Sequence, residues 1–237
     1  MLFPYCLLKT KKALPDLIGI ADTPVKYEAH EGLIMAYSDI GDTPVSAMAE
    51  MVETSLKRHP AIVFEQVIMT LHRRFPTIPM RFGETISSQE AVQQVLHTHA
   101  SSIHQVLNTM GDKTELIFKV HLTSRGSSDL PEGLRSSDHK GVSYLRKKYQ
   151  KHQQASVTDS AVKSVEKAFL SVFQAELFDH RLQVKPQSVA IRLLMDKSFT
   201  VSEAAIAAIK EKIADAEVSF VGQFPPYHFV SLSLAKP

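Results

Sequence analysis

The side chains most able to do chemistry in this sequence are a single cysteine and a histidine-rich segment. Cys6 could act as a nucleophile, but it lies in the apolar run 2–8 with no catalytic signature around it, which is typical of a buried structural thiol. His97, His99 and His104 crowd one stretch, yet no two of them are three or four residues apart. They therefore share no helix face in chelating register, and we expect packing or surface histidines.

Carboxylates offer no clearer site. Asp39, Asp42 and Glu115 are candidates for acid and base, but closeness along the chain says little about the spatial pairing that acid–base catalysis needs. The sequence contains no P-loop, dinucleotide fingerprint, nucleophile elbow or HExxH helix, and its nine glycines leave little material for phosphate cradles. We therefore predict no catalytic residue, no cofactor and no metal. A small-molecule enzyme would need a deep pocket with convergent polar groups.

The net charge of the chain does not indicate a class of partner. The chain carries 27 Lys and Arg against 25 Asp and Glu, a formal net charge of +2, so no strong general field draws it to nucleic acid. Two small basic clusters could touch phosphate, although a solvated helix face is the plainer interpretation. They are Arg73 with Arg74, and Arg146, Lys147, Lys148 and Lys151.

Two short segments are more distinctive. The sequence PMRFG, residues 79–83, places Arg81 between apolar residues in an extended stretch, where a buried guanidinium would need an internal partner. The sequence GQFPPYHFV, residues 222–230, joins a rigid double proline to three aromatic rings. Such a segment either locks the end of the chain onto the core or displays an apolar contact surface. Five of these residues are predicted to bind protein: Arg81, Phe82, Phe224, Tyr227 and Phe229.

These segments must be positioned by strands and helices. The first predicted elements are strands at 2–8 and 32–40. Three-and-four spacing predicts a helix from Val45 to His59, a second from Pro60 to Phe75, and a third from Ser87 or Ser88 to a glycine cap at Gly111. The piece TIPMRF between the last two is extended. We place a domain boundary near Gly111 and predict an N-terminal α+β domain over residues 1–110.

The second half alternates strands and helices. Residues 115–122 form the most regular strand, and residues 124–141 are predicted to be a mobile surface loop. Helices follow at 142–153 and 159–181, and the remaining elements are a strand at 189–195, a helix at 202–214, an extended piece at 218–221 and a last strand at 227–234. This order favours an antiparallel or mixed sheet with helices on one face, over residues 111–237.

Composition sets the class of protein and its compartment. Hydrophobic residues make up 44% of the chain and charged residues 22%, as in ordinary globular proteins. One cysteine excludes an intramolecular disulfide and fits a reducing compartment. We find neither a secretory signal nor an apolar run long enough to cross a membrane. We therefore expect a cytoplasmic protein of two α+β domains.

The two distinctive segments resemble the gas vesicle accessory protein family GvpF/GvpL. The family carries a P-L-R-F-G element between a helix and a strand, and residues 79–83 match it with Met80 in place of leucine. It also carries G-P-W-P-P-Y-x-F near the end of its second domain. Residues 222–229 match that element apart from Gln223 and Phe224.

Two further stretches lie between these motifs in the family's order. Residues 115–120 (ELIFKV) look like its central strand, and residues 141–145 (GVSYL) look like its G-x-x-Y-L helix start. Four motifs with the right order and gaps make the resemblance fairly specific, and it covers nearly the whole chain. The departures are Phe224 in place of the family's tryptophan and PYCLLK in place of its glycine-bearing first strand.

The resemblance implies a fold and a function. The fold is two α+β domains, the second a modified ferredoxin-like α/β sandwich with extra helices. The function is that of a non-catalytic, gas-vesicle-associated assembly factor, which binds the hydrophobic shell protein and other accessory proteins. The alternative is a nucleic-acid-binding protein on a ferredoxin-like sheet, but the strand 115–122 supplies only Phe118 for base stacking, on its buried face.

Overall fold

The computed structural model describes residues 1–41, 59–122, 159–185, 188–213 and 216–230. The chain divides into two compact units, one built from residues 1–115 with the segment from residue 223 onward, and the other from residues 116–222. The helix predicted from Val45, the loop predicted at 124–141 and the helix predicted at 142–153 lie outside the described residues, apart from His59.

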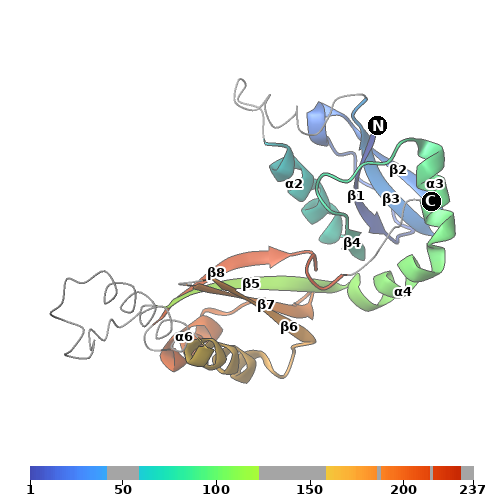
Figure 1. The fold of residues 1–237 in the computed structure, drawn as a ribbon. Coiled ribbons are helices and arrows are strands. Elements are labelled where there is room, and N and C mark those ends of the chain that lie inside the picture. Colours follow the sequence, from blue (N-terminus) through green and yellow to red (C-terminus); the bar gives the residue numbers. More distant parts are fainter. Residues whose placement is uncertain (42–58, 123–158, 186–187, 214–215, 231–237) are drawn as a thin grey trace, which may run out of the picture. The chain divides into compact units, whose positions relative to one another are not determined.

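The first unit is built on a four-stranded sheet (Figure 1). Its strands are β1 (Leu2–Leu8), β2 (Val25–His30), β3 (Leu33–Asp39) and β4 (Thr77–Pro79), in the order β2-β3-β1-β4. Every neighbouring pair is antiparallel. The strand predictions at 2–8 and 32–40 are therefore confirmed, whereas β2 was not predicted.

A bulge in β1 lets a wholly apolar strand serve both faces of this sheet. The pairing of β1 with β3 shifts register between Pro4 and Cys6. Successive side chains of a regular strand alternate, so Phe3 and Cys6 would point to opposite faces. The extra residue brings both into the same core, while Leu2 and Leu7 enter the core on the other side.

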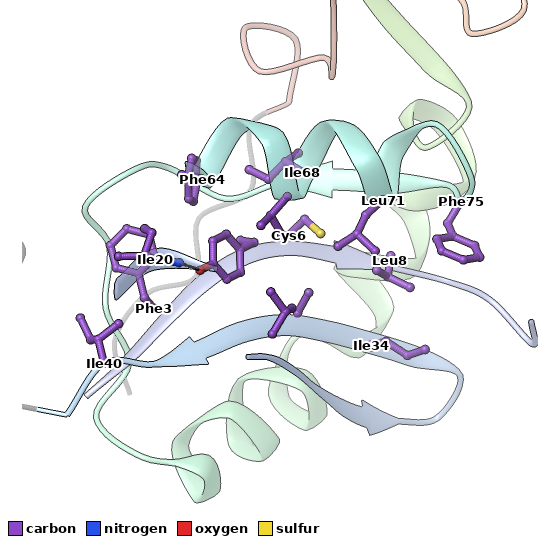
Figure 2. Close-up of a cluster of buried hydrophobic side chains, with 14 residues drawn as sticks. Phe3, Cys6, Leu8, Ile20, Ile34, Ile40, Phe64, Ile68, Leu71 and Phe75 are labelled. Carbon is purple, nitrogen blue, oxygen red and sulfur yellow. Dashed lines mark hydrogen bonds between the residues drawn. The ribbon is translucent and has the colours of Figure 1, made fainter. Parts of the chain in front are cut away.

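Helices cover both faces of the first sheet. Helix α2 (Pro60–His72) packs on the core that contains Phe3 and Cys6, as Figure 2 shows. Helices α3 (Gln89–Thr98) and α4 (Ala100–Met110) pack on the other core. The Nδ1 of His59 accepts the N–H of Ala61 at 3.2 Å, which caps the first turn of α2.

The helix predicted from residue 87 to residue 110 is in fact two helices. The break falls at His99, whose φ of −105° and ψ of 11° interrupt the helical backbone between α3 and α4. The apolar spacing continues through the break, so a periodicity argument reads the two helices as one. Gly111 does follow α4, but with φ −62° it is not in the left-handed conformation expected of a glycine cap.

The second unit is also a four-stranded sheet with helices. Its strand order is β6-β7-β5-β8, and the sheet is antiparallel. The elements in chain order are β5 (Lys113–Leu122), a helix over residues 159–173, β6 (Asp179–Lys185), β7 (Ser188–Asp196), α6 (Glu203–Lys212) and β8 (Ala216–Phe224). The α+β class predicted from the sequence is confirmed.

The two helices in the described part of the second unit contribute to one core. Phe169 and Phe173 from the first helix and Ile209 from α6 join Phe118 of β5 in a single buried cluster. The rings of Phe118 and Phe169 lie 5.0 Å apart in edge contact. The Oγ of Ser202 accepts the N–H of Ala205 at 3.1 Å and caps α6.

Two predictions for this half were wrong. The helix predicted at 159–181 ends at residue 173, and the chain then enters β6, whose sequence DHRLQVK is mostly exposed and lacks an apolar stripe. The last strand predicted at 227–234 is a turn at 227–229 in the described part of the chain. The domain division after residue 110 stays a prediction, and residues 223–230 pack with the first unit.

Candidate protein-binding site

The predicted contact residues Arg81 and Phe82 lie on a tight turn that leaves the end of β4. The N–H of Met80 donates to the carbonyl of Tyr5 at 2.9 Å and continues the pairing with β1. The chain then reverses, since Gly83 has φ 92° and the N–H of Glu84 donates to the carbonyl of Arg81 at 3.3 Å. A side chain is strained at that φ, so glycine is required for this turn.

Phe82 is an exposed aromatic ring on an aromatic support. Its ring centre lies 5.7 Å from that of Phe3 and 5.4 Å from that of Phe64, both in edge-on contact. Phe3 and Phe64 are buried, whereas Phe82 is 43% exposed. Arg81 beside it is exposed as well, so its guanidinium does not need the internal partner that burial would demand. The turn therefore presents a cation next to a fixed apolar surface.

The other predicted contact residues lie in residues 223–230, which we call the return segment. It leaves β8 and folds into a turn after its two prolines. The N–H of Tyr227 donates to the carbonyl of Pro225 at 2.7 Å, and the N–H groups of Phe229 and Val230 donate to the carbonyl of Pro226 at 3.1 and 3.2 Å. Because proline fixes φ, the segment is held with little conformational freedom.

Two residues at the start of β5 anchor the return segment. The Oγ1 of Thr114 donates to the carbonyl of Phe224 at 2.9 Å. The carboxylate of Glu115 accepts the backbone N–H of His228 at 3.1 Å, and its other oxygen lies 2.8 Å from His228 Nδ1. Glu115 is fully buried while His228 is 47% exposed. A buried carboxylate is costly unless it is partnered, so this anchor stabilises the attachment of the segment.

The return segment reaches both cores of the first unit. Tyr227 packs against the core under α2, and Val230 packs against the core under α3 and α4. Burial raises the pKa of the Tyr227 phenol, and the nearby carboxylate of Glu65 on α2 raises it further. Since the two cores lie on opposite faces of the sheet, the segment passes around the border of the sheet. Phe229 is only 6% exposed.

The five predicted residues thus fall into two groups. Arg81 and Phe82 are exposed, whereas Phe229 is buried and Phe224 and Tyr227 are partly buried. Both groups meet the core under α2, the first through Phe82 and the second through Tyr227. The burial of Tyr227 and Phe229 gives them a packing role, and their contact role stays a prediction.

The described residues considered for chemistry have separate surroundings of their own. Burial raises the pKa of the Cys6 thiol, which is fully enclosed. The pKa of Asp39 is lowered, chiefly because its carboxylate accepts the N–H of Gly41, and Lys26 lies 3.6 Å away. Asp42 lies outside the described residues, as does the basic run 146–151. Within the described ranges, no three His, Cys, Asp or Glu side chains are arranged to hold a metal.

A polar contact between β2 and α3 was not predicted. Gln89 and Gln93 each donate a side-chain N–H to the carboxylate of Glu28, at 2.6 and 2.8 Å. One turn further along α3, His97 Nδ1 lies 3.3 Å from His30 Nε2. The sequence does contain a sign of this face, because Gln89, Gln93 and His97 recur at intervals of four. Its partner strand was missed, so the contact was missed too.

No helix in the described part of the chain is long and apolar enough to cross a membrane. The nucleic-acid alternative is not supported. Phe118, the ring it would use for base stacking, is fully buried in the core of the second unit.

Comparison with known proteins identifies the same family as the sequence motifs. The family profile of the gas vesicle synthesis protein GvpL/GvpF matches residues 1–231. The crystal structure of the gas vesicle protein GvpF from Anabaena sp. PCC7120 superposes with a TM-score of 0.73 at 15% identity, over 98% of both chains. That of GvpF from Microcystis aeruginosa gives 0.64 at 15% identity, over 98% of this chain and 99% of the other. No protein with a curated description matches the sequence.

Proposed function

The chain belongs to the gas vesicle synthesis protein GvpL/GvpF family, and we propose on this premise that it is a non-catalytic assembly factor that binds the hydrophobic gas vesicle shell protein. The observation that carries the proposal is the turn at Arg81 and Phe82. An exposed phenylalanine supported by two buried rings offers an apolar contact at little entropic cost, because its neighbours already hold it.

The hydrophobic shell protein needs a soluble partner before it assembles. A very apolar subunit that assembles into a wall would aggregate if its β surface met water before joining the shell. A soluble protein that covers this surface keeps the subunit available for assembly. The first unit is the part proposed to do so, with Arg81 and Phe82 in the contact. Phe224, Tyr227 and Phe229 are proposed to serve the same surface by holding the return segment in place.

The two units are proposed to be two domains, the second a modified ferredoxin-like sandwich. Its element succession of strand, helix, two strands, helix and strand, with order β6-β7-β5-β8, supports that name. We propose a cytoplasmic, gas-vesicle-associated location and other gas vesicle accessory proteins as further partners.

Site-specific photocrosslinking tests the proposed contact. A photoreactive phenylalanine analogue is placed at position 82 of the full chain, which is co-expressed with the shell protein of its own source. The matched control places the analogue at position 178, because Phe178 of the second unit is 58% exposed. We expect shell-protein adducts from position 82 and few from position 178.

A second pair of variants separates contact from folding. Phe82→Ser removes the exposed ring, and Phe178→Ser removes an exposed ring of the same type elsewhere. Melting temperatures identify any loss of fold, since Phe82 also contacts Phe3 and Phe64. Capture of the shell protein should fall for Phe82→Ser alone. Equal capture by both folded variants, together with equal crosslinking at both positions, would reject the first unit's turn as the contact.

A further inference from the structure

Strand β6 (Asp179–Lys185) is an end strand of the second sheet and its outer side is exposed. In the order β6-β7-β5-β8, no described strand pairs with β6 on the side away from β7. Five of its seven residues are exposed. Val184 lies opposite Val189 of the core, yet it is 49% exposed. An end strand of this kind presents backbone N–H and C=O groups that can pair with another strand.

Neither a bulge nor a proline in β6 prevents such pairing. Its register with β7 is continuous over seven residue pairs, and no proline or glycine interrupts the sequence DHRLQVK. The other end strands differ: β4 is three residues long and ends in Pro79, Glu28 of β2 is bonded to α3, and β8 contains Gly222. Proline and glycine weaken a strand. Among the described edges, β6 is therefore the best suited to strand addition.

The sequence of β6 is complementary to a second copy of itself in the antiparallel direction. If a two-fold axis passes through Leu182, Asp179 of each copy lies opposite Lys185 of the other. Leu182 then lies opposite its own copy, and His180 lies opposite Val184. Cross-strand pairs of opposite charge and of apolar side chains stabilise a sheet. The strand therefore places an ion pair at each end of the contact and an apolar pair at its centre.

Symmetry and charge together select this register. Directly opposed residues of an antiparallel pair lie on the same face of the sheet, so the two-fold axis must pass through a residue. With the axis at Arg181, that arginine would lie opposite its own copy, and with the axis at Gln183 it would lie opposite Lys185. Like charges directly opposite each other are destabilising. The axis at Leu182 places Arg181 opposite Gln183 instead, and larger shifts shorten the pairing.

We propose that the protein forms a two-fold symmetric homodimer through β6, which joins the second sheets of two copies into one continuous sheet. Such an interface is isologous, so the pair of Asp179 with Lys185 occurs twice. The pairing also removes an exposed edge from both copies, and exposed edges promote aggregation. The proposal is independent of the contact with the shell protein, because the Phe82 turn belongs to the first unit. A dimer would carry two such turns.

Sedimentation velocity of the purified full chain over a range of concentrations tests the dimer. We expect a reversible dimer whose fraction rises with concentration. Asp179→Lys and Lys185→Glu each place like charges opposite each other at both ends of the contact. Each should raise the dissociation constant of the dimer by at least about tenfold. The matched control is Glu217→Lys on the end strand β8, which is exposed and changes the net charge as Asp179→Lys does. It should leave the dimer unchanged.

Mixing the two variants gives a result that a loss of fold cannot produce. In a mixed dimer of Asp179→Lys with Lys185→Glu, opposite charges face each other at both ends of the contact. We therefore expect the mixture to dimerise at concentrations where each variant alone is monomeric. The double variant Asp179→Lys/Lys185→Glu should dimerise by itself, since it exchanges the two charges and keeps the pair. Melting temperatures show whether each variant is folded.

Three results would overturn the proposal. The first is a wild-type chain that stays monomeric at every concentration. The second is a dimer that both single substitutions leave unchanged, or that Glu217→Lys weakens equally. The third is a mixture and a double variant that remain monomeric although their chains are folded, because the pair of Asp179 with Lys185 would then not form.

Discussion

The anchor of the return segment allows a quantitative prediction. Glu115→Gln preserves the size of the buried side chain and keeps one oxygen that can accept the N–H of His228. The substitution removes the negative charge from the group that lies 2.8 Å from His228 Nδ1. A hydrogen bond to a charged group contributes about 1.5–3 kcal/mol. We therefore expect the attachment of the return segment to weaken by about 2 kcal/mol.

Hydrogen exchange of the return segment measures this loss directly. A weakening of about 2 kcal/mol corresponds to roughly thirtyfold faster exchange, because 1.36 kcal/mol is a factor of ten. Only the amides of residues 223–230 should speed up to that extent, since the opening is local. Peptides from β7 (Ser188–Asp196) of the second unit serve as an internal reference and should change little.

A second His–Glu pair supplies the matched control. Glu166 Oε1 lies 2.8 Å from His180 Nε2 in the second unit, but these side chains are 34% and 29% exposed. Solvent screens such a pair, so Glu166→Gln should destabilise the protein less than Glu115→Gln. It should also leave exchange at residues 223–230 unchanged. Wild-type exchange of the return segment in Glu115→Gln, or equally accelerated exchange in Glu166→Gln, would contradict the anchoring role of Glu115.

Three further predictions concern single residues. Burial raises the pKa of Tyr27 to about 12 from a model-compound value of 10.0, so the stability it contributes is complete below pH 10 and is lost as the pH rises toward 12. Urea unfolding at the two ends of that pH interval should show that the free energy of unfolding falls less in Tyr27→Phe than in the wild type. An equal fall in both proteins would contradict this. Cys6 is enclosed and its thiol pKa is raised, so a disulfide reagent should label it only in urea. Rapid labelling of the native protein would show that it is accessible. Gly111→Ala would place a methyl group 2.5 Å from the carbonyl oxygen of Leu107 and 2.8 Å from Cβ of Pro76. We expect the free energy of unfolding to fall by about 1–3 kcal/mol, and unchanged urea unfolding would contradict the contact.

The parts of the fold that were predictable from sequence are those that bury a regular apolar stripe. The strands at 2–8 and 115–122 and the helix from Pro60 follow this rule, because their side chains face a core. The edge strands β2 and β6 were missed. Their sequences, VKYEAH and DHRLQVK, are largely polar, since an edge strand exposes much of its length to water.

Residue type and spacing single out the candidate contact residues, whereas their exposure and their anchoring contacts depend on the fold. Arg81 and Phe82 stood out by type and spacing, and the turn with Gly83 then exposed them. The anchoring of the return segment joins Glu115 to His228, and the histidine pair joins His30 to His97. Contacts between residues this far apart in sequence depend on the tertiary fold, so no local pattern specifies them.

The central proposal, that this protein keeps the shell protein soluble, is tested most directly by co-expression of the two full chains. Shell protein is measured in the soluble fraction and after affinity purification of the partner, with Phe82→Ser and Phe178→Ser in parallel. We predict soluble, co-purifying shell protein with the wild type and with Phe178→Ser, and a marked loss with Phe82→Ser. Shell protein that remains insoluble and fails to co-purify with the wild type would contradict the account.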